Sequence, residues 1–530
     1  MSHVQSRRNA ARRRRRVAAR HGLAGHWGEQ PSPMLGSGTV SYEVGGNLDA
    51  TCFGGIAAVH RLVTKLGLVD QINEGLHLLK VHLPYHESDH VLNLTYNVMC
   101  GGTRLEDIER LRHDTAYMNA LGADLIPDPT TAGDFCRRFA ETDVVELMEA
   151  INAVRPQLWA GRGGDLLGPL AYIDADGTIV PTSGRRKAGM DMSYNRIWGY
   201  APLIVSLANT KEVLYLVNRP GNAPSHQDAA TWIDKAIDLV QPHAPRVCLR
   251  GDTDFSLTAH FDRWAARVDF VFGMDNNHAL RTRAEALAET CWTRLHRDAT
   301  AQNATAQNAT AQNAAGQNAA AQNATAQNAA GQIRARRDNH KQAIVAERGY
   351  LNLELNYEDV ACFDYQPGKC DRSYRVVALR KNISRSRGEQ VLIDEVRYFF
   401  YITTRTDLSA EQVVACANQR CDQENIIASL KSGVGALRVP LHDLVSNWAY
   451  MVIAALAWNI KSWFAMMMHR KADRRDYIRM EFRRFFNTII LIPAMVTRRA
   501  RAITIRLIGY NPALDRLFSA WNTTERTRFG

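Results

Sequence analysis

Paired cysteines are the first feature that this 530-residue sequence lacks. Its nine cysteines are odd in number and scattered along the chain, and no two of them form a Cys-x-x-Cys pair. Zinc ribbons contain such pairs, and disulfide frameworks contain even sets of cysteines at close spacing. We therefore expect neither kind of scaffold, and a reducing cytoplasm is the simplest location.

Long apolar runs are absent as well. The most apolar stretch, residues 444–468, is broken by Asn447, Asn459 and Lys461, so we interpret it as a buried core helix and expect no membrane partner. No apolar segment follows the N-terminal arginines, which argues against a secretory signal. The sequence also contains neither a Gly-rich phosphate loop nor a nucleophile elbow, so no motif supports chemistry of either kind.

Acidic residues are missing from residues 1–20, which carry eight arginines and supply most of the net charge of +11. Repulsion between these charges predicts that the arm does not fold by itself. A Gly-, Pro- and Ser-rich linker follows this arm, so we expect residues 1–50 to be largely disordered. Such an arm is typical of segments that contact the phosphates of a polyanion, although a tail without a specific role has the same composition.

Helical periodicity predicts an α-helical domain over residues 51–160. Two short helices on either side of Gly101-Gly102 are compatible with a helix-turn-helix DNA reader, and equally with a plain helical hairpin. A later helix, beginning near Thr131, carries Arg137 and Arg138. We expect this domain to help bind DNA.

Three histidines in the same region, His82, His86 and His90, are spaced four residues apart. This spacing suggests a metal-binding helix face. Pro84 interrupts the helical register, however, and no fourth ligand is evident, so we predict no metal site here.

After residue 165 the pattern changes to three strands, a helix, a strand, a helix and a strand, and it resumes near residue 395 with a strand and a helix. This order is that of a ribonuclease H-like α/β domain, made of residues 165–274 and 395–470. Residues 275–394 are expected to hold a β-rich insertion as a small subdomain, and residues 471–530 a basic C-terminal region.

Inside the insertion, residues 301–332 repeat a five-residue unit of the type AQNAT. The repeat has no apolar face to bury, which predicts disorder.

Acidic residues stand at the ends of two predicted strands. Asp174 and Asp176 end the first strand, and Asp252 and Asp254 end the fourth. The carboxyl ends of strands in an α/β sheet border a common crevice with the adjoining helix, so we expect these acids to approach Glu424 of the later helix. Converging carboxylates suit Mg²⁺, and two such ions can promote phosphodiester chemistry.

The later helix, predicted over residues 417–432, places Arg420, Glu424 and Lys431 on one face, since they are four and seven residues apart. An ordinary ion pair four residues apart would have the same spacing. The strand-end acids upstream favour the other interpretation, in which Glu424 is a third metal ligand.

In combination, these motifs resemble those of a known family. DADGT around Asp176, LRGDTDF around Asp252 and QRCDQENIIASLKSG over residues 419–433 are similar to motifs of bacterial insertion-sequence transposases of the DDE class. The group concerned has a β-rich insertion before the catalytic glutamate. Its signature is Tyr, two residues, Arg, three residues, Glu, six residues, Lys, and this chain matches it except that Ala417 occupies the tyrosine position.

The resemblance implies a homodimeric cut-and-paste transposase of the bacterial cytoplasm, associated with the nucleoid when bound to DNA. It would bind the terminal inverted repeats of its element and catalyse strand cleavage and transfer on double-stranded DNA. Asp176, Asp252 and Glu424 would hold two Mg²⁺ or Mn²⁺ ions, with Asp174 and Asp254 as less favoured ligands. The side chains expected at DNA phosphates are Arg420, Lys431, Arg185, Arg186, Arg137 and Arg138.

Three alternative interpretations share these sequence features. Arg185, Arg186 and Lys187 would line the DNA path, unless the segment is only a solvated loop. A non-specific nuclease on the same fold would carry the same acids. An inactive DNA-binding relic would account for Ala417 and the expanded repeat.

Overall fold

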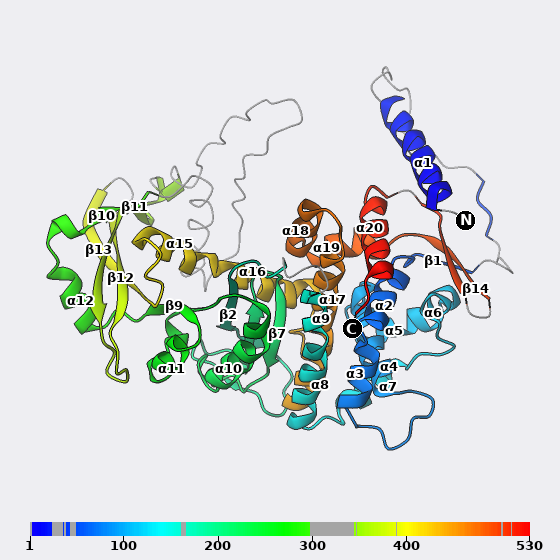
Figure 1. Ribbon diagram of the computed structural model, residues 1–530, viewed down its shortest axis with the longest axis horizontal. Coiled ribbons are helices and arrows are strands. Elements are labelled where there is room, and N and C mark those ends of the chain that lie inside the picture. The colour runs from blue at the N-terminus through cyan, green and yellow to red at the C-terminus, as the bar shows by residue number, and fades with distance from the viewer. Residues whose placement is uncertain are drawn as a thin grey trace.

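The computed structural model describes residues 3–23, 35, 39–42, 49–160, 166–296, 344–345, 347–387, 390–499, 502–509 and 511–529. They form a region built on a large β-sheet and a mainly helical region, with helix α17 (Leu444–Met466) between the two (Figure 1). The five-residue repeat at 301–332 lies outside the described residues.

The large sheet has nine strands in the order β10-β11-β12-β13-β9-β8-β2-β6-β7. Strands β2, β8 and β9 are parallel to one another, and β6 and β7 continue the sheet in antiparallel fashion on the far side of β2. The bounds are β2 (Ala171–Gly177), β6 (Leu203–Leu207), β7 (Glu212–Val217), β8 (Val247–Gly251), β9 (Asp269–Met274), β10 (Thr293–Arg294), β11 (Leu351–Tyr365), β12 (Tyr374–Arg387) and β13 (Gln390–Thr403).

The predicted α/β class is confirmed. Helices α10 (Ala229–Val240) and α11 (Phe261–Ala265) follow β7 and β8, so the main elements occur in the predicted order up to β9. Strands β6 and β7 are buried at every residue, which explains their near-continuous apolar sequences. A small sheet in the order β3-β5-β4, made of β3 (Val180–Pro181), β4 (Asp191–Met192) and β5 (Trp198–Tyr200), was not predicted.

The strands between β9 and β13 do not form the separate subdomain that we expected. Strand β13 pairs with β9, from Phe400 opposite Met274 to Thr403 opposite Val271, and β12, β11 and β10 add beyond it. Strand β12 pairs along the other edge of β13, with Ala378 opposite Phe400, so the strands of the insertion extend the same sheet. Helix α12 (His278–Glu285) precedes these strands.

The helical region contains α2 (Ile56–Lys65), α3 (Leu68–Gly75), α4 (Glu87–Met99), α5 (Ile108–Arg112), α6 (Thr115–Leu121), α7 (Pro129–Cys136), α8 (Glu141–Ala153) and α9 (Arg155–Ala160). Helix α7 begins two residues before the predicted start, because the Asp128 carboxylate accepts the backbone N–H of Thr131 and caps it.

The C-terminal region belongs to this helical region and is not separate from it. Strand β14 (Ala494–Arg499) pairs with β1 (Ala50–Thr51) and with β15 (Ala502–Leu507), and α18 (Lys471–Arg479) and α19 (Phe482–Phe485) precede it. Helix α20 (Leu514–Arg526) packs on α2, where Arg61 pairs with Glu525 at 2.8 Å and Lys65 Nζ donates to the Thr524 carbonyl at 2.7 Å. The two ends of the chain therefore stabilise each other.

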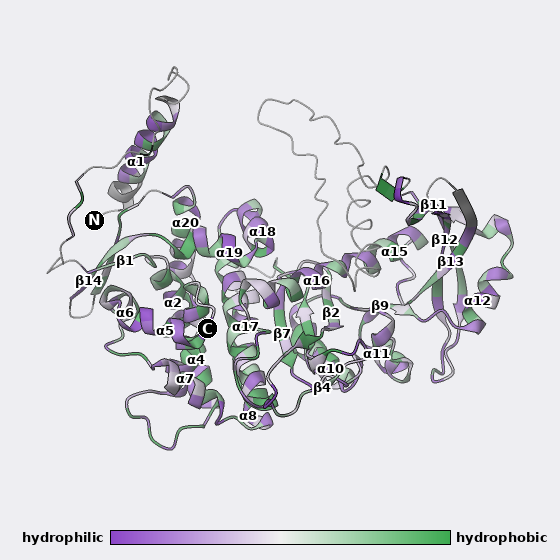
Figure 2. Ribbon diagram, turned by 180° about the vertical axis from the view of Figure 1, so that it is seen from behind, coloured by the Kyte–Doolittle hydropathy of each residue, from purple (hydrophilic) through white to green (hydrophobic). Residues whose placement is uncertain are grey.

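One expectation for the N-terminal half is corrected. Residues His3–Leu23 form helix α1 instead of a disordered arm, which agrees with the strong helix propensity of arginine and alanine. Figure 2 colours most of this ribbon as hydrophilic. Helix α4, the first helix of the supposed helix-turn-helix, is buried at twelve of its thirteen residues. In a helix-turn-helix the second helix enters the DNA groove, so the burial of α4 does not decide between a DNA reader and a plain helical hairpin.

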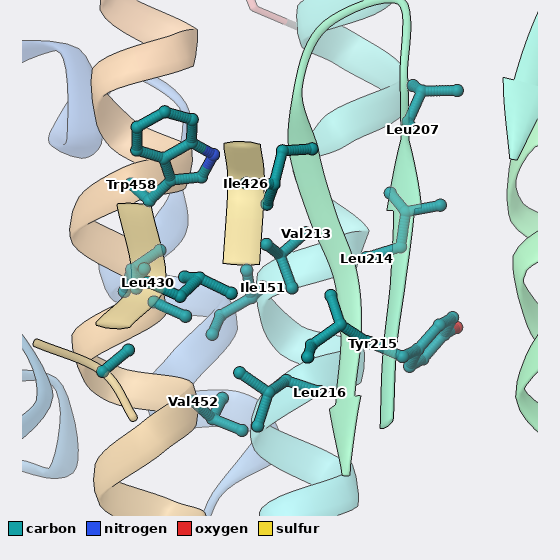
Figure 3. Close-up of a cluster of buried hydrophobic side chains, with 14 of the residues drawn as sticks. Ile151, Leu207, Val213, Leu214, Tyr215, Leu216, Ile426, Leu430, Val452 and Trp458 are labelled. Carbon is teal, nitrogen blue, oxygen red and sulfur yellow. The ribbon is translucent and has the colours of Figure 1, made fainter. Parts of the chain in front are cut away.

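Helix α17 forms the hydrophobic centre of the molecule, as its apolar sequence predicts. Every residue from Ser446 to Met466 is buried. Val452 of α17 lies beside Leu216 of β7, and Ile426 of helix α16 (Cys421–Ala428) belongs to the same cluster, so this core joins the sheet to α16 (Figure 3). Among the described residues, no helix is long and apolar enough to cross a membrane.

Candidate active site

Two strand-end acids meet at one edge of the sheet. In the parallel pair of β2 and β8, Asp174 lies opposite Arg250. Asp176 and Asp252 each follow two residues later, so register alone brings them to the same end of neighbouring strands. The sequence-based expectation of convergence is therefore met for these two residues.

A guanidinium group joins the two carboxylates. Nη1 of Arg420 lies 3.2 Å from Oδ2 of Asp176 and 3.9 Å from Oδ2 of Asp252. Arg420 stands between helix α15 (Ala410–Gln419) and helix α16 (Cys421–Ala428). The sequence-based role for this arginine was a phosphate clamp, whereas in this structure it contacts the acids themselves.

Glu424 and Lys431 complete the cluster from the same segment. Glu424 lies on α16, and its charge acts on Asp176. Lys431 lies in a π-helical turn, Ser429–Gly433, which extends α16. Burial lowers the pKa of Lys431 and the charge of Asp176 opposes that shift, so this ammonium also lies within electrostatic range of the acids.

The position of Glu424 is set by the two residues before it. Gln423 is fully buried, donates from Nε2 to the carbonyl of Ile204 at 3.2 Å and accepts from the Ser206 hydroxyl on β6. Asp422 pairs with Lys211 at 2.5 Å, just before β7. These contacts fasten α16 across the sheet, and no local sequence signal distinguished Gln423 or Lys211 as positioning residues.

Burial and mutual repulsion perturb the acids. Burial raises the pKa of Asp176 to about 7; the Arg420 charge opposes this rise, and the charges of Asp252 and Glu424 add to it. The pKa of Asp252 is also raised, first by burial, again against the effect of Arg420. Ionisation of these neighbouring, buried carboxylates is unfavourable, so the site favours the binding of a positive charge.

The two less favoured acids have other partners. Asp174 is buried and forms a bidentate pair with Arg250, at 2.7 and 2.8 Å, so it is not free to bind a metal. Asp254 is exposed, and its backbone N–H donates to Oδ1 of Asp252 at 3.0 Å. The preference for Asp176 and Asp252 therefore has a geometric basis.

The basic residues expected near DNA differ in their surroundings. Lys187 donates to the carbonyls of Val439 and Leu441, so it fastens a loop and does not project into solvent. Arg185 and Arg186 are exposed on the segment between β3 and β4. Arg137 pairs with Asp134 and, like Arg138, is exposed after helix α7, in the helical region and away from the acid cluster (Figure 1).

The donor set fits a divalent cation. Asp176, Asp252 and Glu424 supply carboxylate oxygens, the ligands that hard ions prefer. A cation, the Arg420 guanidinium, already lies against two of the three acids. Carboxylates on a sheet edge and an adjoining helix, with arginine and lysine beside them, are the side chains expected of a DDE-type site.

Comparison with known families agrees with this class. The family model for the transposase DDE domain group 1 matches residues 39–528. The chain therefore belongs to this family of DDE transposases, whose members generally use divalent metal ions. No curated protein matches the sequence.

A solved structure of a piggyBac transposase synaptic complex with hairpin DNA is similar to this chain over 82% of its length and 81% of the other chain. The sequence identity is 9% and the TM-score is 0.34.

Proposed function

We propose that the protein is a cut-and-paste DNA transposase that binds the terminal inverted repeats of its own element and cleaves and transfers the strands. The observation that carries this proposal is the contact of Asp176 and Asp252 with one guanidinium, with Glu424 alongside. The sheet order β7-β6-β2-β8-β9, with the first three strands antiparallel and the last two parallel to β2, supports a ribonuclease H-like catalytic core.

In the proposed site Asp176, Asp252 and Glu424 hold two Mg²⁺ or Mn²⁺ ions. Such ions activate a water or a 3′-hydroxyl and stabilise the oxygen that leaves phosphorus. The chain itself positions the DNA. With divalent ions held by the acids, the Arg420 guanidinium would be free to hold a phosphate through two parallel hydrogen bonds, with Lys431 as a second cation.

The DNA path in this proposal crosses the small β3-β5-β4 sheet. Its hairpin exposes Tyr194 at 87% and Trp198 at 50%, and Arg185 and Arg186 lie on the same excursion from the main sheet. Exposed aromatic rings beside cations are typical of nucleic-acid contacts, since rings stack on bases while cations bind phosphates. Helix α1 adds a second basic surface for non-specific contact with DNA.

The test uses the full-length protein and DNA that carries the terminal repeats of its element. We expect wild-type protein with Mg²⁺ or Mn²⁺ to cleave at the repeat ends and to join the 3′ ends to target DNA. Asp176→Asn, Asp252→Asn and Glu424→Gln should each abolish cleavage while mobility shifts show intact repeat binding. Asp254→Asn, an adjacent acid outside the Arg420 contact, is the matched control and should remain active.

Two other outcomes would replace the proposal. Cleavage of any DNA without joining would identify a non-specific nuclease. Specific repeat binding without cleavage by the wild-type protein would identify an inactive relic. The proposed active species is a homodimer because two element ends must be paired, and light scattering of the protein–DNA complex measures this.

A further inference from the structure

A second group of metal-binding side chains lies in the helical region, at the loop between α3 and α4. His82 and His86 belong to the loop, and Glu87 is the first residue of α4. One ligand atom from each side chain lies within 4.8 Å of the others. The two imidazoles are exposed, whereas the Glu87 side chain is only 2% exposed. The acids of the catalytic cluster contribute nothing to this group.

The Glu87 carboxylate is oriented by the backbone. Its Oε1 accepts the N–H groups of Leu78 and Leu79 at 3.1 and 2.9 Å. Its Oε2 faces Nε2 of His82 at 3.0 Å. One oxygen is therefore held by the loop while the other is directed at the histidines, which is how a carboxylate ligand is fixed by its outer hydrogen bonds.

Contacts other than the ion pair between His82 and Glu87 also hold the two histidines in place. The rings of His82 and His86 are stacked, with centroids 4.3 Å apart and planes 21° from parallel. The backbone N–H of His86 donates to Asp89 at 2.8 Å, and that of Ser88 donates to Oδ1 of Asn73 at 2.9 Å, which ties the start of α4 to α3. An ion pair with Glu87 accounts for His82 alone and leaves the second imidazole unexplained.

We propose that His82, His86 and Glu87 form a Zn²⁺ site that fastens the loop of residues 76–86 to helix α4. Two imidazole nitrogens and one carboxylate oxygen are a donor set that zinc accepts, with water in the fourth position. Ligand atoms each about 2.1 Å from a tetrahedral ion lie roughly 3.4 Å apart. The three ligand atoms already lie within 4.8 Å of one another, so the ion would draw them closer by roughly 1 Å.

Charge favours a transition-metal ion over the alternatives. Glu87 is a buried anion, and a dication compensates it while both imidazoles stay neutral and act as ligands. Mg²⁺ prefers oxygen ligands, so this site differs from the catalytic acids in the metal that it selects. His90, the third histidine of the original series, is excluded because it is buried and stacked on Phe135 at 4.4 Å.

The experiment titrates metal-free, full-length protein with Zn²⁺ by calorimetry, and with Co²⁺ by the visible absorption of its tetrahedral complexes. Excess Mg²⁺ is present throughout to occupy the catalytic carboxylates. We expect one equivalent of Zn²⁺ to bind wild-type protein, and His82→Ala, His86→Ala and Glu87→Gln each to weaken binding at least about 10-fold, as loss of a ligand does. Gln at residue 87 can still accept from the loop N–H groups, so this variant should fold.

The control is His113→Ala, since His113 pairs with Glu109 at 3.1 Å without a second imidazole. It should bind Zn²⁺ as the wild type does. As an independent readout, Zn²⁺ should slow tryptic cleavage after the exposed Lys80 in the wild type but not in Glu87→Gln. Equal Zn²⁺ affinity in wild-type, His82→Ala and His86→Ala proteins, or no bound equivalent in the wild type, would overturn the proposal. None of these measurements depends on transposition.

Discussion

The buried acid Asp176 should make the metal-free protein less stable at neutral pH. Its side chain is 14% exposed, and its pKa is raised from 3.8 to about 7, mainly by burial. The folded state therefore favours the protonated form. Below pH 3.8 the acid is neutral in both states and carries no penalty. As the pH rises towards 7, the unfolded chain gains from ionisation and the folded chain does not, so stability is lost across this window.

The size of this loss follows from the pKa shift. Each unit corresponds to 1.36 kcal/mol, so ionisation of Asp176 costs the folded state at most about 4 kcal/mol above pH 7. Asp176→Asn removes the titrating group but keeps an oxygen that can accept from Arg420. We expect this variant to be more stable than the wild type at pH 8 in a chelating buffer, and the difference to disappear near pH 4.

Urea unfolding of both proteins across this pH range, in EDTA, measures the difference directly. Mg²⁺ or Mn²⁺ should then stabilise the wild type and leave Asp176→Asn nearly unchanged, because a ligand stabilises only the state that binds it. Asp254→Asn serves as the control and should follow the wild type in both conditions. A difference in the free energy of unfolding between wild-type and Asp176→Asn proteins that does not change with pH would refute the assignment of Asp176 as a buried acid with a raised pKa.

Three further predictions concern positioning and DNA contact. Glu212→Gln should lower the free energy of unfolding by about 3–5 kcal/mol in urea titrations, because buried Glu212 accepts from Arg155, Trp159 and Trp463, and the change leaves Arg155 as an unpaired buried charge. Lys187→Met should cost about 1–3 kcal/mol in the same assay, since two carbonyls lose their donor, but should not change the salt slope of DNA binding. Deletion of residues 1–23 should weaken non-specific DNA binding and flatten its salt dependence, and an unchanged slope would contradict a role for α1.

Much of the fold could be predicted because its signals are local. Buried strands such as β6 and β7 are continuous apolar runs, and α17 is an apolar helix too interrupted by polar residues for a membrane. What the sequence could not indicate are contacts between distant segments. The pairing of β1 with β14 and the extension of β13 beyond β9 depend on register between strands far apart in the chain, for which no short pattern exists.

Residues of the candidate site likewise differ in how far the sequence could indicate their roles. Asp176, Asp252 and Glu424 could be proposed from the sequence because strand ends and a helix face have recognisable patterns. The cations were harder to assign, because a lysine or arginine has the same sequence signature whether it faces DNA or a carbonyl. Lys187 is bound by two carbonyls and Arg250 by Asp174, so neither is available to a phosphate.

The contacts of Arg420 in the structure change the interpretation of its function. The family resemblance implied that it is a phosphate ligand beside the metal ions. In the structure it contacts both acids that would bind those ions, at 3.2 and 3.9 Å, so metal and guanidinium compete for the same carboxylates. In the proposed function, metal held by these acids would therefore free Arg420 for a DNA phosphate. An arginine that is freed only when the acids are neutralised would couple phosphate binding to metal occupancy, which a permanently exposed lysine could not do.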